Sequence, residues 1–220
     1  MTILWDWNGT LLDDTLSAVD ALNEMLSKRG LAPIDAGFYR ANFAFPVRPF
    51  YEAIGVDLDN EDWDALAREY HEAYRRRRPG LNEEAVAALE QAKRRGARQA
   101  IVSALRQDLL DEETSRLGVR GYFEKIRGTD NLDGKSKLDC AAELAAAMQD
   151  IPSRIVFIGD SLHDKEVADA VGAKCVLFGG GSHSPERLRA AAPTGDSLPH
   201  AVELAFAACG ENTLQRESQP

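Results

Sequence analysis

Ile3-Leu4-Trp5-Asp6-Trp7-Asn8-Gly9-Thr10 sets the architecture expected of this 220-residue chain. An apolar run that stops on a carboxylate and turns through Asn-Gly is typical of a short β-strand that enters a tight turn. Ligands bind at the carboxyl ends of the strands in an α/β sheet, so Asp6 lies where chemistry is expected. A plain N-terminal strand with an ordinary turn explains this segment equally well, because short motifs have many false positives.

A second stretch of the same design lies near the other end of the chain. Residues 155–158 form an apolar run, Gly159-Asp160 follows it, and Asp164 comes four residues later. If the two strands are parallel neighbours, Asp6, Asp160 and Asp164 meet at one edge of the sheet. Three acids repel one another unless a cation lies among them, and a cluster of hard oxygen ligands with room for water suits Mg²⁺.

The order of these motifs resembles the haloacid dehalogenase superfamily. That superfamily has a strand ending in DxDGT, a strand ending in Ser or Thr, a lone lysine and a strand ending in GDxxxD. The matching positions here are Asp6-Trp7-Asn8-Gly9-Thr10, Ser103, Lys137 or Lys135, and Gly159-Asp160 with Asp164. The resemblance covers most of the chain, and the ordered set is specific although each single piece is weak.

Helical signals fill the chain between the first two of these motifs. Asp13-Asp14-Thr15 predicts the start of a helix that ends at Gly30. A long amphipathic stretch begins at Asn60 and ends at Pro79-Gly80. The apolar positions expected on one face of the first helix are Leu16, Val19, Leu22, Met25 and Leu26.

Strand and helix signals alternate after this insertion. Strands are expected over residues 99–103, 123–127, 155–158 and 174–178, with a helix after each of the first three. Such alternation favours an α/β, Rossmann-like core, in which helices cover both faces of a parallel sheet.

The chain is therefore expected to form two domains and a tail. The core domain consists of residues 1–13 and 80–210, the helical cap domain of residues 14–79, and the polar tail of residues 211–220, which we expect to be flexible. The resemblance implies a cap of the C1 type, which closes over the site, excludes water and selects the substrate.

Composition narrows the class of partner. A net charge of -10 gives no positive field to attract a nucleic acid. Three cysteines without paired spacing fit a reduced, cytoplasmic protein, and no apolar stretch approaches membrane-spanning length. We expect a small-molecule partner, no nucleic acid, no membrane, and a monomer or weak homodimer.

The resemblance implies a Mg²⁺-dependent phosphatase that acts on a small phosphorylated metabolite. Asp6 would be the nucleophile and would form an aspartyl-phosphate that water hydrolyses. A carboxylate oxygen of Asp6, the backbone carbonyl of Asn8, and Asp160 would hold Mg²⁺, with Asp164 acting through water.

The remaining motifs would bind the phosphoryl group. Thr10, and Ser103 together with Ala104, would donate hydrogen bonds to its oxygens, and a lysine would add a point charge. Lys135 and Lys137 compete for that role. Lys137 is favoured because it stands at the entrance of the following helix.

Asn8 is the departure from the superfamily pattern. The aspartate usual at this position protonates the leaving alkoxide and later activates water, and an amide can do neither. Positioned acid–base groups contribute about 10²- to 10⁴-fold, so turnover can survive but would be slow or confined to good leaving groups.

Three alternatives stay open. A dehalogenase or a phosphonate hydrolase would also lack the acid at position 8. The pair of Asp160 and Asp164 argues against a metal-free dehalogenase, and a phosphonate hydrolase would need a reactive cap lysine, for which the sequence offers Lys28. The third alternative is a catalytically impaired protein that binds a phosphorylated metabolite or a protein partner.

The substrate is the least determined feature. The layout looks most like the phosphoglycolate phosphatases, including the loop at residues 179–184. Arg48 is the cap residue expected to face the site, where its guanidinium could grip a substrate carboxylate. A surface arginine beside a packed aromatic cluster fits the same residues.

Overall fold

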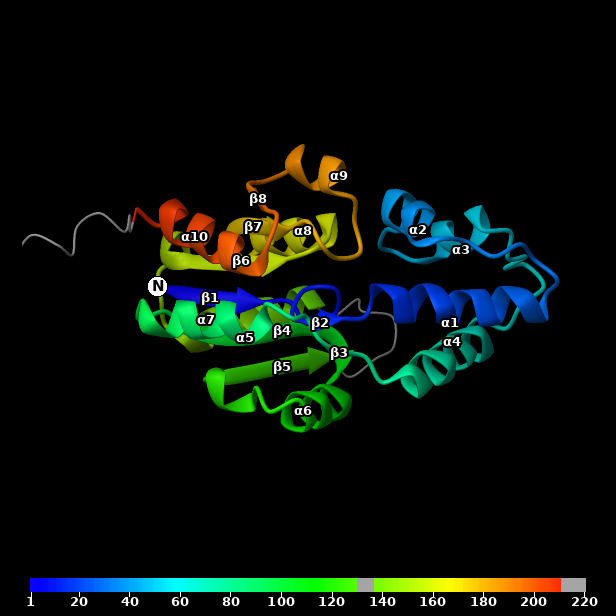
Figure 1. The fold of residues 1–220 in the computed structure, drawn as a ribbon, viewed down its shortest axis with the longest axis horizontal. Helices are drawn as coiled ribbons and strands as arrows, with labels where there is room; N and C mark the ends of the chain where they lie inside the picture. Colours follow the sequence, from blue (N-terminus) through cyan, green and yellow to red (C-terminus); the bar gives the residue numbers. More distant parts are fainter. Residues whose placement is uncertain (130–136, 211–220) are drawn as a thin grey trace, which may run out of the picture.

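The computed structural model describes residues 1–129 and 137–210, so Lys135 and the tail at residues 211–220 lie outside the described residues. The strands of its main sheet are β1 (Thr2–Trp5), β4 (Arg98–Arg106), β5 (Lys125–Thr129), β6 (Ile155–Gly159), β7 (Lys174–Phe178) and β8 (Thr194–Gly195). They pair in parallel in the order β5-β4-β1-β6-β7-β8 (Figure 1). The N-terminal strand β1 therefore lies at the centre of the sheet.

Helices cover both faces of this sheet, which confirms the expected α/β, Rossmann-like core. They are α5 (Ala85–Arg94), α6 (Gln107–Arg116), α7 (Lys137–Met148), α8 (Leu162–Ala170), α9 (Pro185–Arg189) and α10 (Leu198–Ala208). Because side chains alternate along a strand, Ile3 and Trp5 join one apolar core with α5 and α10, whereas Leu4 joins the opposite core with α7 and α8. None of the helices in the described part of the chain is long and apolar enough to cross a membrane.

A second group of helices lies beyond the carboxyl edge of the sheet (Figure 1). These helices are α1 (Thr15–Lys28), α2 (Ala36–Asn42), α3 (Arg48–Ala53) and α4 (Trp63–Arg77), and we call them the cap. The cap has an apolar core of its own, separate from the two cores against the sheet. The chain passes from the core to the cap through β2 (Leu12–Asp13) and returns to the core through β3 (Gly80–Leu81). These two strands pair antiparallel.

Leu16 does not lie on the apolar face of α1 as the periodicity predicts. Its side chain is 63% exposed, because the cap core begins only at Ala18, further along the helix. Asp14 precedes α1 as expected, yet its carboxylate makes no capping hydrogen bond to that helix. This carboxylate belongs instead to the site described below.

Several element boundaries also differ from expectation, among them that of β5, which lies two residues later than the expected strand over residues 123–127. β4 continues to Arg106 instead of ending at Ser103, with an irregularity in its pairing to β5. α8 begins three residues before the expected Lys165, because Ser161 and Asp164 form a capping box at its start. The edge strand β8 was not expected, since two residues are too few to show a period.

Two leucines of α1 provide a test of the separate cap core. Leu26→Ala should lower the free energy of unfolding by about 2–5 kcal/mol, because a fully buried side chain leaves a cavity. Leu16→Ala, in the same helix, should change it by less than about 0.5 kcal/mol. Urea unfolding followed by circular dichroism measures both, and equal effects would contradict the described packing.

Candidate active site

Asp6, Asp160 and Asp164 lie together at the carboxyl edge of the sheet. Each offers a carboxylate oxygen, and these oxygens lie within 4.8 Å of one another. The topology explains the meeting, because Asp6 follows β1 and Asp160 follows the neighbouring strand β6. The backbone N–H of Asp6 donates to the carbonyl of Ile158 at 2.8 Å, which fixes the two strand ends side by side.

Lys137, the first residue of α7, bridges two of these acids. Its Nζ lies 2.5 Å from Oδ1 of Asp6 and 2.6 Å from Oδ1 of Asp164, and its side chain is 5% exposed. Burial lowers the pKa of this ammonium, but the carboxylates of Asp164 and Asp6 raise it by more, so Lys137 stays charged. The structure thus brings Lys137 into the site.

One ammonium does not balance three buried carboxylates. Burial raises the pKa of Asp6 well above its usual range, and Lys137 lowers it only in part. Burial and the nearby Asp164 also raise the pKa of Asp160. For Asp164 burial has the same sense, but Lys137 and the Ser161 hydroxyl outweigh it, so its pKa is lowered. The cluster therefore favours an additional positive charge.

Asp164 is occupied by protein partners on both oxygens. Oδ1 accepts from Lys137, and Oδ2 accepts from the backbone N–H of Asp160 at 3.0 Å and of Ser161 at 2.9 Å. The Ser161 hydroxyl donates to the same Oδ2 at 2.7 Å. This side chain therefore positions Lys137 and the turn after β6.

Asp160 is held between two glycines. Gly9 has a φ of +77°, and a Cβ on it would lie 2.2 Å from Oδ2 of Asp160. A Cβ on Gly181 would lie 2.3 Å from the same oxygen, to which the N–H of Ser182 donates. A side chain at either position would collide with the Asp160 carboxylate, so the site requires glycine at both positions.

The residues around Asp6 and Asp160 fit a Mg²⁺ ion. Oδ2 of Asp6 and Oδ1 of Asp160 share a single donor, the hydroxyl of Thr10, at 3.1 and 3.2 Å. One proton cannot satisfy both oxygens, so acceptor capacity remains. The carbonyl of Asn8 accepts no hydrogen bond from residues 1–129 or 137–210. Oxygen donors of this kind are those that Mg²⁺ prefers.

Thr10 and Ser103 do not face the cavity as the phosphate-binding prediction requires. Thr10 is buried against the acids, and the Ser103 hydroxyl donates to the side-chain carbonyl of Asn8 at 3.4 Å and accepts from the N–H of Leu105 at 3.0 Å. Ala104 and Leu105 do line the cavity. Because β4 continues past Ser103, the Ser103 side chain is buried, and the residues that follow it, Ala104 and Leu105, border the cavity.

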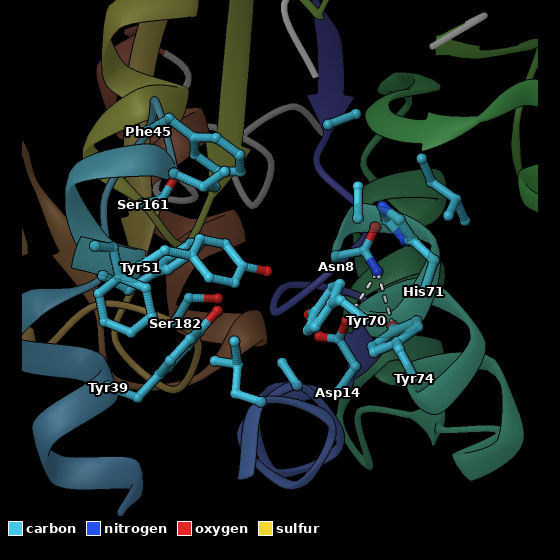
Figure 2. A pocket seen from close by; sticks show the side chains of 18 of the residues that line it. Asn8, Asp14, Tyr39, Phe45, Tyr51, Tyr70, His71, Tyr74, Ser161 and Ser182 are labelled. Atoms are coloured by element: carbon cyan, nitrogen blue, oxygen red, sulfur yellow. Dashed lines mark hydrogen bonds between the residues drawn. The ribbon is translucent and has the colours of Figure 1, made fainter. Parts of the chain in front are cut away.

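Asn8 faces a carboxylate that the sequence did not associate with the site. Its Nδ2 donates to Oδ2 of Asp14 at 2.8 Å and to the hydroxyl of Tyr74 at 3.0 Å (Figure 2). The Tyr74 hydroxyl and the N–H of Gly9 also donate to Asp14, at 2.5 and 2.6 Å. Burial raises the pKa of Asp14 to about 6 despite these three donors. An amide at position 8 matches the carboxylate at position 14.

A cavity of about 710 Å³ separates this site from the cap. Asp6, Asn8, Asp14, Lys137 and Asp160 line its floor. The cap contributes mainly aromatic rings, among them those of Tyr39, Phe43, Phe45, Tyr51, Trp63 and Tyr70 (Figure 2). The cap therefore presents an apolar wall to the acids.

Arg48 is not part of this wall, which corrects the prediction that it faces the site. It is exposed, and its guanidinium lies 4.9 Å from the centroid of the Trp63 ring. Trp63 lines the cavity, and Arg48 does not. As the second possibility held, Arg48 is a surface arginine beside an aromatic cluster.

Hydrogen bonds join the cap to the loop after β7. Nε of Arg40 in α2 donates to the carbonyl of Gly181 at 2.9 Å. Arg187 of α9 donates to the carbonyls of Arg40 and Phe43 at 2.9 and 3.0 Å. His183 lies beneath this seam, where burial lowers its pKa to about 4 and keeps it neutral. The structure thus holds the cap over the cavity.

Sequence comparison places this arrangement in a known family. The model of the family described as haloacid dehalogenase-like hydrolase matches residues 3–178. The chain belongs to the haloacid dehalogenase-like hydrolases. The resemblance inferred from the motif order is thereby confirmed.

Two relatives and one solved structure illustrate the family. The phosphoglycolate phosphatase of Caulobacter vibrioides is 30% identical over 190 residues, which cover 80% of this chain and 78% of the relative. The tyrosine-protein kinase PtkA of Mycobacterium tuberculosis is 27% identical over 184 residues, 81% of this chain but only 62% of the kinase. A crystal structure of a predicted phosphatase from Clostridium acetobutylicum has the same fold, with a TM-score of 0.75, 18% identity, and 94% of this chain and 98% of that chain covered.

Sequence reasoning missed Asp14, Tyr39, Tyr51 and Tyr74. Asp14 was interpreted only as a helix cap, although its place six residues after the departure at Asn8 was a usable signal. The tyrosines looked like ordinary core residues, because a helical stripe of aromatic residues does not show which of them border a cavity.

The Lys137 contacts predict a pH-dependent loss of stability. In metal-free buffer, Lys137→Met should lower the free energy of unfolding by about 3–5 kcal/mol at pH 7, because it leaves buried acids without their cation. The lowered pKa of Asp164 stabilises the native protein at pH values above the unfolded value of 3.8, and this contribution is lost only as the pH falls below it. The deficit should shrink toward pH 4 for another reason, because the buried acids that the variant leaves without a cation take up protons there.

Urea unfolding at both pH values in the presence of a chelator measures this difference. Lys165→Met is the matched control, because its partly exposed ion pair with Asp169 should contribute at most about 1 kcal/mol. An equal deficit at pH 4 and pH 7 would mean that packing, rather than charge, explains the effect.

Proposed function

We propose that this chain is a Mg²⁺-dependent phosphatase that hydrolyses a small phosphorylated metabolite through an aspartyl-phosphate on Asp6. The observation that carries the proposal is the buried cluster of three carboxylates with Lys137 in contact with two of them. A phosphate group can approach this negative cluster only when a cation offsets the repulsion. The family and the name of the Caulobacter relative support phosphate chemistry.

Asp6, Asp160 and the carbonyl of Asn8 would hold Mg²⁺, with Asp164 acting through water. When bound, the ion neutralises the repulsion between carboxylate and phosphate. Asp6 attacks phosphorus, and the P–O ester bond breaks as the new O–P bond forms, so the leaving oxygen departs with the bonding electron pair and takes a proton from water. Water then hydrolyses the acyl phosphate and restores the carboxylate. Lys137 orients the Asp6 carboxylate and lowers its pKa in part against the effect of burial. Backbone amides after Asp6 donate to the phosphoryl oxygens.

The alternatives inside the superfamily receive less support. A metal-free dehalogenase has no need for a cluster of three acids. A phosphonate hydrolase needs a lysine in the cavity, but Lys28 lies on the surface with its side chain 56% exposed and its Nζ 3.0 Å from Glu69. The two-domain division, the cytoplasmic location, the small-molecule partner without nucleic acid or membrane, and the monomeric or weakly dimeric state stay predictions.

Phosphate release from an activated ester tests the proposal. With Mg²⁺ the protein should release inorganic phosphate from 4-nitrophenyl phosphate, and chelation or Asp6→Asn should abolish the release because each removes an essential group. Calorimetry should show Mg²⁺ binding that weakens in Asp160→Asn. Full activity after exhaustive chelation would contradict the metal requirement, and Mg²⁺ binding without turnover would favour a catalytically impaired binding protein.

Asn8 and Asp14 should behave as a coupled pair. Exchanging them in Asn8→Asp/Asp14→Asn restores the usual acid while keeping one carboxylate and one amide in contact, and it should speed the hydrolysis of an alkyl phosphate by about 10²- to 10⁴-fold. Asn8→Asp alone should gain less, because it sets two carboxylates against each other. Asp14→Asn alone is the control and should gain nothing. Equal gains in kcat for Asn8→Asp and for the double variant would show that the two positions are independent.

A further inference from the structure

The cap wall of the cavity is built from mutually packed aromatic rings. The rings of Tyr39 and Phe43 stack with centroids 4.6 Å apart, and Phe43 meets Phe45 edge to face at 5.3 Å. Tyr51 and Trp63 form another edge-to-face pair at 5.8 Å. Rings held by one another present fixed faces and edges, which an aromatic ligand can meet at little entropic cost.

Among the described residues of this wall, no buried lysine or arginine is available to bind a carboxylate. Among the described residues that line the cavity, the lysine and arginine side chains are those of Lys137 and Arg68. Lys137 is engaged with Asp6 and Asp164, and Arg68 lies at the exposed rim together with Asp64. A two-carbon acid would also leave most of about 710 Å³ unfilled.

Two tyrosine hydroxyls point from the cap into the cavity. Tyr39 and Tyr51 are 4% and 7% exposed, and their hydroxyls make no hydrogen bond to any residue in the described ranges. Figure 2 shows both directed toward the wall that carries Asn8 and Asp14. Both tyrosines line the cavity, so their hydroxyls are placed to exchange hydrogen bonds with polar substituents of a bound ring.

The floor of the cavity favours the same kind of ligand for an independent reason. Asn8 cannot protonate a leaving oxygen, so the leaving group must depart as an anion. A phenol, with a pKa near 10 like the tyrosine side chain, leaves far more readily than an aliphatic alkoxide, whose basicity is near that of hydroxide.

We propose that the substrate is an aryl phosphate, the phosphate ester of a phenolic hydroxyl, whose ring lies among the aromatic side chains of the cap. This rests on the proposed phosphatase function and specifies its substrate class. Asp6 forms a bond to phosphorus, the P–O(aryl) bond breaks, and its electron pair leaves on a phenolate that takes a proton from water. A second water cleaves the acyl phosphate, so the sum is aryl phosphate plus water to phenol plus inorganic phosphate.

Four substrates separate the ring from the quality of the leaving group. Phenyl phosphate has both, benzyl phosphate has only the ring, acetyl phosphate has only the good leaving group, and phosphoglycolate has neither. With Mg²⁺, kcat/KM for phenyl phosphate should exceed that for phosphoglycolate by about 100-fold or more, because the acid is absent. KM for phenyl phosphate should be about tenfold or more below that for acetyl phosphate, because the ring is buried.

A matched pair of cap variants tests the placement of the ring. Phe45→Leu should raise KM for phenyl phosphate about three- to tenfold, and by more than it raises KM for acetyl phosphate, because a ring contact is lost from the cavity. Phe38→Leu is the control, since Phe38 is an exposed aromatic residue of the same cap that does not line the cavity.

Binding provides a measurement that does not depend on turnover. By calorimetry with Mg²⁺, phenylphosphonate should bind about tenfold or more tightly than methylphosphonate. Equal affinities, or a KM for acetyl phosphate at or below that for phenyl phosphate, would overturn the aryl assignment while phosphate release upheld the phosphatase. Release of phosphate from none of the four compounds would overturn the phosphatase and, with it, the aryl phosphate substrate.

Discussion

The contact of one buried ammonium with two buried carboxylates is the interaction on which the site depends. Lys137 draws Asp6 and Asp164 together although desolvation opposes all three charges. Three buried charges stay in contact only when the backbone holds them in place. Here the adjacent ends of β1 and β6 and the first turns of α7 and α8 do so. The remaining negative charge, centred on Asp160, makes the cluster suited to a divalent cation and, through it, to a phosphate group.

The acidic residues and the lysine on the floor of the cavity could largely be predicted from the sequence. The cap residues that form the opposite wall of the cavity could not. Asp6, Asp160 and Asp164 could be grouped because strand ends in a parallel sheet share one edge, a rule that needs only the order of the elements. Lys137 could be chosen because helix entrances follow that edge. The alternation of strands and helices predicted a parallel sheet, but it gave neither the strand order nor the edge strand β8.

Residues of the cap obey no comparable rule. Four helices packed on one another can turn many faces toward the core, and the sequence does not say which. Arg48 illustrates the difficulty, since it lies within an aromatic cluster that borders the cavity and yet projects outward over Trp63. Ser103 is a further case, because it is buried and does not line the cavity, whereas Ala104 and Leu105 do, next to an irregularity in the pairing of β4 with β5. Asn8 looked like a loss of function in isolation, but in the structure it is one half of a matched pair with Asp14.

The hydrogen bonds between cap and core have a consequence for how the substrate selectivity of this protein can evolve. Arg40 and Arg187 donate to carbonyl oxygens of the main chain, which every amino acid possesses. A substitution at Phe43 therefore leaves its accepting carbonyl in place, whereas Gly181 is fixed because a Cβ there would collide with Asp160. The cap residues that line the cavity can therefore change one at a time while the hydrogen bonds between cap and core remain. New substrate selectivity can evolve in this way without a change in the acidic cluster.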